Sequence, residues 1–147
     1  MRTFTLFVLF AFTVSMTPAS AQTPMAWGTN TFGQLGVPVP SYTPRQAFMS
    51  YVKQISAKGS HTLALKNDGT IWAWGDNIYG QLGDGTTNDR TNPVRVQGLS
   101  DVVSISAGGI GNLALKADGT VWAWGDNRAG QCGNDITFPR YTPVQVN

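Results

Sequence analysis

The chain has 147 residues, enough for one ordinary domain, and 41% of them are hydrophobic, which excludes a disordered protein. Only 12% are charged, and ten Lys and Arg against eight Asp, with no Glu, give a formal net charge of +2. The basic residues are scattered rather than clustered on one stretch, so we expect no nucleic-acid partner.

The first 21 residues have the pattern of a secretory signal peptide. Arg2 supplies a positive start, residues 4–16 form an apolar run, and small residues at 19–21 precede Gln22 as a cleavage site. A membrane-spanning helix is the alternative, but it needs about 20 apolar residues, and Pro18 ends this run earlier. The sequence therefore predicts a secreted or periplasmic protein that has no membrane attachment after cleavage.

The rest of the chain is a repeat. Residues 51–97 align with residues 101–147 without a gap and are identical at more than half of the positions, and a partial copy at 25–36 precedes them. The period is about 50 residues. We divide the chain into a signal peptide (1–21), a partial first repeat with the last two strands of a blade (22–51), a second repeat (52–97), a linker (98–101) and a third repeat (102–147). The signature residues of the repeat are Trp27, Trp72, Trp74, Gly75, Asp76, Gly80, Gly83, Trp122, Trp124, Gly125, Asp126, Gly130 and Gly133.

Each complete repeat has the pattern of four short strands. In the third repeat, residues 102–107 are rich in β-formers, residues 112–116 alternate, and residues 120–125 alternate again, so that Trp122 and Trp124 share one face. The Asp118-Gly119 pair between two alternating runs is a hairpin signal. After the tryptophan strand, the run Asp-Asn-x-x-Gly-Gln-x-Gly predicts a tight, self-capped turn.

A last strand, over residues 93–97 or 143–147, is expected to open on its proline, a position that proline tolerates in a sheet. Four short strands per repeat without helical periodicity predict an all-β protein built from β-propeller blades of four antiparallel strands, two complete and one partial. In such a fold the tryptophans fill the space between adjacent blades.

The stretch GSHTLALKNDGTIWAWGDNIYGQLG, residues 59–83, resembles the repeat of the regulator of chromosome condensation family. The resemblance covers residues 25–147 and implies blades of a seven-bladed propeller. Three positions depart from the pattern: Met25 stands for the first Trp, Thr29 for the Asp, and Gly111 for the residue that is His61 in the second repeat. The family's founding member is a nuclear exchange factor for a small GTPase, and secreted bacterial relatives include an inhibitor of a β-lactamase.

The residues offer little material for catalysis. The chain has one His, one Cys and no Glu. His61 lacks an evident partner for acid–base work, so we expect it to be structural. Cys132 stands where the other copies have Leu35 and Leu82, which predicts a small apolar slot, and a single Cys forms no internal disulfide.

The acidic residues also favour a structural interpretation. They recur at turns, where capping of the backbone explains them, as at Asp68, Asp76, Asp118 and Asp126. The loop over residues 83–90 lacks the spacing of acids that a calcium-binding loop uses. We therefore predict no catalytic residue, no cofactor and no metal site.

A binding role remains, and in a repeat protein it is expected where the copies differ. The differing pairs lie beyond the tryptophan strand: Ile78/Arg128, Tyr79/Ala129, Asp84/Asn134, Gly85/Asp135 and Asn88/Phe138. From these we select Tyr79, Asp84, Arg128 and Phe138 as candidate contacts for a protein partner.

The primary hypothesis is an exported protein-binding or scaffold module without catalysis of its own. The alternatives are a nucleotide-exchange or chromatin-type regulator, as the resemblance implies, an inhibitor of an extracellular enzyme, and a structural cell-surface array. Because open blade edges favour association, we expect either a fragment of a longer repeat protein or self-assembly that completes the propeller.

Overall fold

A computed structural model describes residues 25–37, 41–46 and 49–147, so the predicted signal peptide lies outside the described residues. In the described part of the chain, no helix is long and apolar enough to cross a membrane. The described elements are β1 (Met25–Gly28), β2 (Ser41–Gln46), β3 (Val52–Lys58), β4 (His61–Lys66), β5 (Ile71–Gly75), β6 (Arg90–Arg95), β7 (Val102–Ala107), β8 (Gly111–Lys116), β9 (Val121–Gly125) and β10 (Arg140–Gln145).

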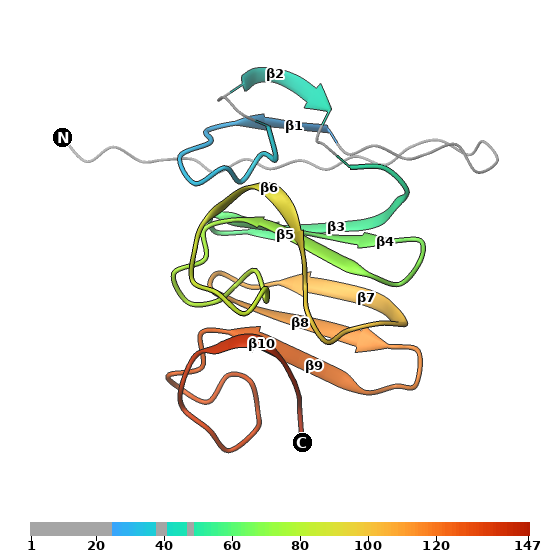
Figure 1. Ribbon diagram of the computed structural model, residues 1–147, viewed down its shortest axis with the longest axis vertical. Coiled ribbons are helices and arrows are strands. Elements are labelled where there is room, and N and C mark those ends of the chain that lie inside the picture. Colours follow the sequence, from blue (N-terminus) through green and yellow to red (C-terminus); the bar gives the residue numbers. More distant parts are fainter. Residues whose placement is uncertain (1–24, 38–40, 47–48) are drawn as a thin grey trace.

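These strands form three antiparallel sheets that lie one after another (Figure 1). Strands β1 and β2 make a two-stranded sheet, here called the half blade. The second blade has the order β3-β4-β5-β6 and the third blade the order β7-β8-β9-β10, so each complete repeat folds as one meander. The all-β fold with two four-stranded sheets and a partial one is confirmed.

The hairpin predicted from Asp-Gly pairs is present in both complete blades. Between β4 and β5 only Gly69 has a positive φ, at 76°, as in a three-residue loop that ends on a left-handed glycine. Asp68 caps this loop, because its Oδ1 accepts from the Thr70 amide at 3.0 Å and from the Thr70 hydroxyl at 2.6 Å. These hydrogen bonds hold the pKa of Asp68 below its ordinary value. The Asp is therefore a turn residue, as expected.

The outer strands differ from the expectation at their start. They begin at Arg90 and Arg140, so Pro93 and Pro143 lie inside the strands and not at their first residue. The reason is a slip in register: Gly75 pairs with Arg90, whereas Ala73 already pairs with Val94. Proline fits there because β6 is the outer edge of its sheet and the irregular stretch needs no ladder hydrogen bond from it.

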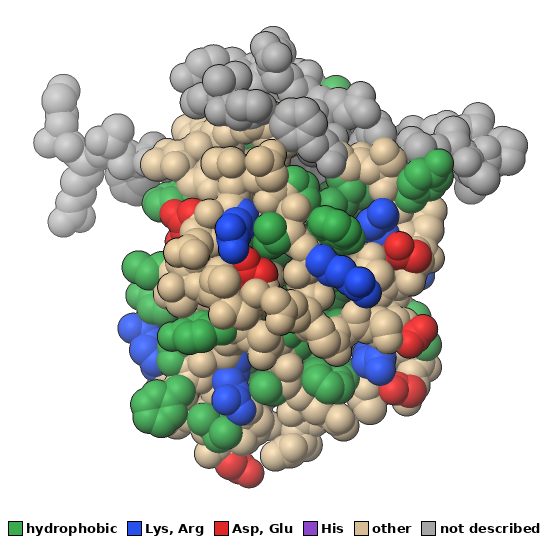
Figure 2. Space-filling view, in the orientation of Figure 1, with side chains coloured by type: hydrophobic (Ala, Val, Ile, Leu, Met, Phe, Trp, Pro, Cys, Tyr) green, Lys and Arg blue, Asp and Glu red, His purple; other side chains and the backbone are tan. Residues whose placement is uncertain are grey.

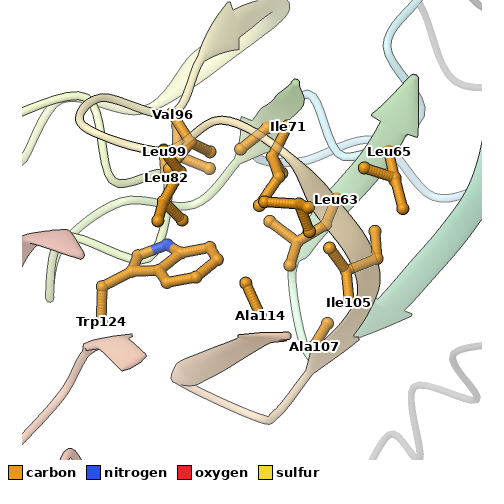
Figure 3. Packing of buried hydrophobic residues seen from close by; sticks show 12 residues of the cluster. Leu63, Leu65, Ile71, Leu82, Val96, Leu99, Ile105, Ala107, Ala114 and Trp124 are labelled. Carbon is orange, nitrogen blue, oxygen red and sulfur yellow. The ribbon is translucent and has the colours of Figure 1, made fainter. Parts of the chain in front are cut away.

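Apolar residues join the second blade to the third. Leu63, Leu65 and Ile71 are 0% exposed and share one cluster with residues of the third blade, among them Ile105 and Trp124 (Figure 3). Each such side chain contributes about 1.5–3 kcal/mol when it is removed from water. The core of this protein is thus largely the boundary between its blades.

The turn after each tryptophan strand is self-capped, as predicted. In the second blade, Asn77 Oδ1 accepts from the Leu82 amide at 2.9 Å, and Gln81 Oε1 accepts from the Tyr79 amide at 2.8 Å. The half blade and the third blade repeat both bonds. Because side chains satisfy the amides of this turn, the main-chain carbonyl of its Gln remains available to the next blade.

The second tryptophan of each complete blade uses that carbonyl. Trp74 Nε1 donates to the Gln34 carbonyl of the half blade at 2.9 Å, and Trp124 Nε1 donates to the Gln81 carbonyl of the second blade at 2.9 Å. A Cβ at Gly83 would lie only 3.0 Å from Trp124 Nε1, so glycine leaves the space for the indole. The expectation that tryptophans fill the space between blades is confirmed for this pair.

The first tryptophan has a more exposed place. Trp72 and Trp122 are partly buried, and their Nε1 atoms donate to Thr70 and Thr120 of the preceding hairpin. The ammonium of Lys66 lies 5.8 Å from the centroid of Trp72. These rings cover the hairpin of their own blade.

Candidate protein-binding surface

The loops that follow β5 and β9 lie on one side of the stacked sheets, opposite the β4–β5 and β8–β9 hairpins (Figure 1). We call the exposed residues of these loops and of the start of β10, within 76–89 and 126–141, the loop surface. Hydrophobic side chains gather on that side of the molecule, whereas basic side chains lie there and elsewhere on the same face (Figure 2). The loop surface also contains the positions at which the repeats differ, so it is the natural place to look for recognition.

Two of the four predicted contact residues meet directly. The guanidinium carbon of Arg128 lies 4.4 Å from the centroid of the Tyr79 ring, in a cation–π contact between the third and second blades. Arg128 Nε also forms an ion pair with Asp126 Oδ1 at 2.8 Å, while 58% of the arginine side chain stays exposed. The pair is therefore held in place by its neighbours and still open to a partner.

Phe138, the third predicted residue, is the most exposed large hydrophobic side chain in the described part of the chain, at 73%. Ile78 is 62% exposed on the neighbouring loop. Large exposed hydrophobic side chains that gather on one side of a protein are uncommon unless that side binds a partner. Both residues belong to the differing positions, so the sequence comparison found them.

Tyr141 is a surface residue that sequence reasoning missed. It is 43% exposed, and its main-chain carbonyl accepts from the Gly85 amide of the preceding blade at 3.0 Å. A Cβ at Gly80 would lie 2.8 Å from the Cα of Tyr141, so the second-blade loop lies directly against β10. The signal was present, because the second repeat has Thr91 at this position, but the pair Thr91/Tyr141 is not among the differing positions from which the candidates were chosen.

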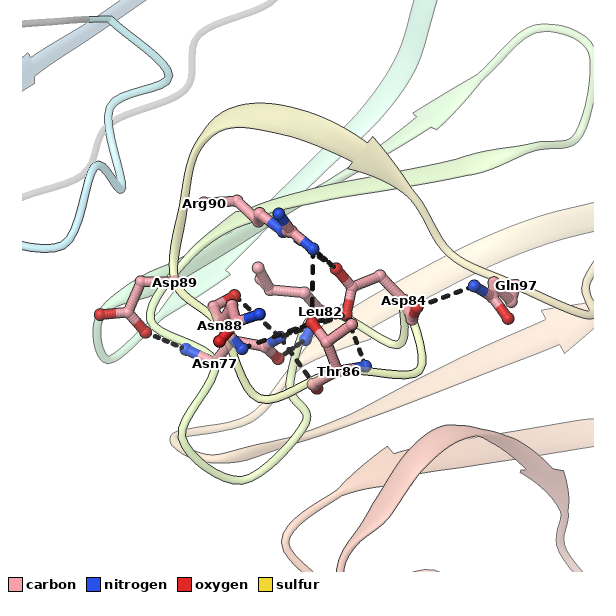
Figure 4. A network of polar contacts seen from close by, with 8 residues as sticks. All are labelled: Asn77, Leu82, Asp84, Thr86, Asn88, Asp89, Arg90 and Gln97. Atoms are coloured by element: carbon pink, nitrogen blue, oxygen red, sulfur yellow. Dashed lines mark hydrogen bonds and ion pairs between the residues drawn. The ribbon is translucent and has the colours of Figure 1, made fainter.

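Asp84, the fourth predicted residue, is placed differently. It is only 9% exposed, and its carboxylate accepts from the Arg90 guanidinium at 2.9 Å and from the Thr86 hydroxyl at 2.7 Å (Figure 4). Burial by itself raises the pKa of Asp84, but the hydrogen bonds from Thr86 and the ion pair with Arg90 outweigh it and lower the pKa. Asp84 therefore shapes the loop from inside rather than presenting a charge to a partner.

The same network fixes the loop to the turn. Asn77 Nδ2 donates to the carbonyls of Thr86 and Asn88 at 3.0 and 3.1 Å. The main-chain amide of Asn77 donates to Asp89 Oδ1 at 2.8 Å. Because its backbone is tied at several points, this loop presents its outer residues at low entropic cost. Rigid loops of this kind suit recognition.

The two residues that sequence reasoning set aside as catalytic candidates are buried. His61 is 1% exposed, and its Nε2 lies 2.6 Å from Asn112 Oδ1 of the third blade. Burial lowers the pKa of His61 against the opposing effects of Asn112 and Asp76. Cys132 is 2% exposed, and burial raises the pKa of its thiol, which disfavours the nucleophilic thiolate. In the described residues, no three His, Cys or Asp side chains come together as metal ligands.

Comparison with protein families matches the repeats directly. The model of the "Regulator of chromosome condensation (RCC1) repeat" matches residues 68–115 and 118–147, and a second model of the same repeat matches residues 52–81 and 102–131. No curated protein matches the sequence. The match to two repeat models over both complete blades agrees with the sheets seen in the structure.

Solved structures share the fold. Human WBSCR16 is 25% identical with a TM-score of 0.70, over 84% of this chain and 34% of that one. Prp20p of Saccharomyces cerevisiae, described with its binding properties to Gsp1p and histones, is 21% identical with a TM-score of 0.74, over 85% and 34%. Yeast RCC1 (Prp20) bound by Kap60 is 24% identical with a TM-score of 0.68, over 97% and 41%. The chain thus spans between a third and two fifths of the length of these structures.

Proposed function

Because the chain belongs to the regulator of chromosome condensation repeat family, we propose that it is a protein-binding module that recognises its partner through the loop surface. The observation that carries this proposal is the group of exposed side chains on tied loops: Phe138 at 73%, Ile78 at 62%, and the Tyr79–Arg128 pair. Aromatic residues and Arg are the types enriched at the centres of protein interfaces.

The chemistry of the loop surface favours a partner with an apolar patch beside an acidic or carbonyl group. Phe138 and Ile78 supply apolar area, and the exposed part of the Arg128 guanidinium supplies hydrogen-bond donors. Asp126 and Tyr79 hold this guanidinium in one orientation, so less side-chain entropy is lost when a partner binds. Yeast Prp20p is bound by Kap60 in one of the similar structures and is described with its binding properties to Gsp1p and histones in the other, which supports a protein as the ligand class.

We propose further that the module acts by binding alone and is exported. His61 and Cys132 are each the chain's sole residue of their type and are nearly inaccessible, which leaves a nucleophile or a general base of these types without access to a substrate. The signal-peptide pattern of residues 1–21 supports export. An exported module would meet an extracellular or periplasmic partner rather than a nuclear one.

The test is a triple substitution, Tyr79→Ala, Arg128→Ala and Phe138→Ala, in the chain as its host produces it. Partners are captured by chemical cross-linking in the source compartment and identified by mass spectrometry. We expect the triple variant to lose the cross-linked partner while its circular dichroism stays unchanged and its unfolding remains cooperative. A matched control, Lys53→Ala with Val103→Ala, changes two exposed residues of β3 and β7 and should keep the partner. Retention of the partner by the triple variant would overturn the proposal.

A further inference from the structure

The open face of the third blade is the counterpart of a face that is fully covered one blade earlier. Leu113, Leu115 and Val121 are 45%, 38% and 38% exposed. Their counterparts in the second blade, Leu63, Leu65 and Ile71, are each 0% exposed, because the third blade packs on them. The same residue types at the same register thus form a core in one blade and a surface in the next.

The polar receptor on this face is repeated as well. The carbonyls of Gln34 and Gln81 each accept an indole N–H from the following blade. Gln131 occupies the same place in the third blade, since its Oε1 caps the Ala129 amide as Gln81 caps the Tyr79 amide. Gln131 borders a hollow of about 310 Å³ that is also lined by Leu113, Ala123 and Cys132. Asn112 and Asp126 line the hollow as well. By its equivalence to Gln34 and Gln81, Gln131 would supply a carbonyl acceptor there, beside the apolar side chains that an indole ring needs.

The glycines give an independent indication of what this face accepts. A Cβ at Gly33 would lie 2.6 Å from the Cα of Thr91, and one at Gly80 would lie 2.8 Å from the Cα of Tyr141, so each of these glycines lets the outer strand of the next blade approach. At Gly130, the equivalent position, a Cβ would have nothing within 4 Å. The third blade thus has free space at Gly130 for an outer strand, as well as a glutamine at the position whose carbonyl accepts an indole N–H in the other blades.

The chain itself has a segment that fits both features. Strands β1 and β2 are a tryptophan strand and an outer strand, and they pair through Gly28 and Ser41 as β5 and β6 pair through Gly75 and Arg90. Trp27 directly precedes Gly28, the register position that Trp74 and Trp124 occupy before Gly75 and Gly125. The half blade therefore contains a tryptophan strand and an outer strand, the two elements with which a following blade contacts the blade before it.

We propose that the open face of the third blade binds the half blade of a second copy of this chain, with the tryptophan strand β1 beside Gln131 and the outer strand β2 lying over Gly130. The contact continues the boundary that already joins the half blade to the second blade and the second blade to the third. It is heterologous, because the two copies use different surfaces, so association runs head to tail. This inference does not rest on the loop surface, which lies on the loops and not on the blade face.

The test measures molar mass against concentration by sedimentation velocity, on the chain as recovered from its host. We expect the wild-type mass to rise above that of one chain as the concentration increases to about 100 µM, the range of a contact with a Kd on the order of tens of micromolar. Leu113→Asp, at a residue that is solvent-exposed within one chain, should weaken association at least tenfold. Trp27→Phe, which removes only the N–H donor, should also weaken it. Ile78→Asp is the control and should leave the mass profile unchanged, because Ile78 lies on the loop surface.

The decisive experiment mixes two variants, each of which has lost one of the two proposed contact surfaces. A Leu113→Asp chain keeps an intact half blade, and a Trp27→Asp chain keeps an intact third-blade face, so the mixture should form a one-to-one complex that neither variant forms alone. Circular dichroism of each variant confirms folding, and Trp27→Ala replaces Trp27→Asp if the latter does not fold. A wild-type chain that stays at the mass of one chain at 100 µM, association that persists in Leu113→Asp, or a mixture without a one-to-one complex would each overturn the proposal. Loss of self-association with retained partner capture, or the reverse, separates this proposal from the loop-surface function.

Discussion

His61 of the second blade and Asn112 of the third blade meet at 2.6 Å across the blade boundary, where both side chains are almost fully buried. The imidazole Nε2 bonds to Asn112 Oδ1, and Asn112 Nδ2 donates in turn to the Gln81 carbonyl at 2.8 Å. The other ring nitrogen, Nδ1, has no partner. The boundary is therefore built for a neutral histidine, because a proton on Nδ1 would place an unpaired charge in the core.

We predict that the stability of the protein falls in mild acid because of His61. Burial lowers its pKa below the ordinary 6.5, so the unfolded chain binds the proton more readily than the folded one. The stabilisation is complete above pH 6.5 and is lost as the pH falls below it, by at most about 1.4 kcal/mol for each pH unit until the folded pKa is reached. Urea unfolding between pH 7 and pH 4.5 measures the slope.

The matched variant for this prediction is His61→Gln, which keeps a hydrogen-bond donor for Asn112 and has no titratable group. The variant should be less stable at pH 7 but should show a shallower decline between pH 6.5 and pH 5. The carboxylate of Asp76 favours the protonated ring and so opposes the effect of burial on the pKa of His61. An identical decline in wild type and variant between pH 6.5 and pH 5 would overturn the assignment of the pH effect to His61.

The second prediction concerns Trp124. Trp124→Phe removes the donor to the Gln81 carbonyl and part of the ring that fills the boundary between the blades. We expect a loss of about 2–4 kcal/mol, because the cost of a buried cavity adds to that of the hydrogen bond. Trp122→Phe, at the half-buried first tryptophan, should cost less than half as much. Both are read from urea unfolding midpoints, and equal costs would contradict the distinct roles of the two rings.

The third prediction uses two glycines at the same position of the repeat. Gly80 and Gly130 have φ values of 79° and 77°, so alanine is strained by about 1–2 kcal/mol at both. Only at Gly80 does the added Cβ also meet the main chain of the next blade, at 2.8 Å from the Cα of Tyr141. Gly80→Ala should therefore be clearly more destabilising than Gly130→Ala.

This comparison is made by thermal unfolding at a protein concentration of about 1 µM, below the range in which we expect copies to associate. At that concentration each chain is expected to be alone, so Gly130→Ala reports backbone strain without a neighbouring blade. Equal losses of stability would mean that β10 moves aside from Gly80 at little cost.

The fourth prediction concerns export. We expect the protein recovered from the periplasm or the medium of its host to begin at Gln22, as the small residues at 19–21 indicate. Intact-mass analysis of that material measures the start of the chain directly. A protein that retains Met1 and stays in the cytoplasm would contradict export, and a larger mass that contains these peptides would show that the repeats belong to a longer chain.

The blade repeat, its four strands and its turn chemistry could be predicted from the sequence, because these depend on local patterns. Alternation sets the strands, and the Asn and Gln of each turn bond to amides only a few residues away. The start of the outer strands was predicted wrongly because it does not depend on a local pattern. The slip that places Pro93 inside β6 depends on pairing with β5, and a pattern within one strand carries no information on its partner's register.

The sequence by itself determined which residues each blade repeats, and only the tertiary structure decided what each copy does. Leu63 and Leu113 share a position in the repeat, yet one is core and the other is surface, because burial depends on whether a further blade lies against the residue. Asp84 differs between repeats like Tyr79, but its carboxylate faces inward to Arg90, whereas Tyr79 meets Arg128 across the boundary. Tyr79 and Arg128 are about 50 positions apart in the chain, and only the stacking of the sheets brings them together.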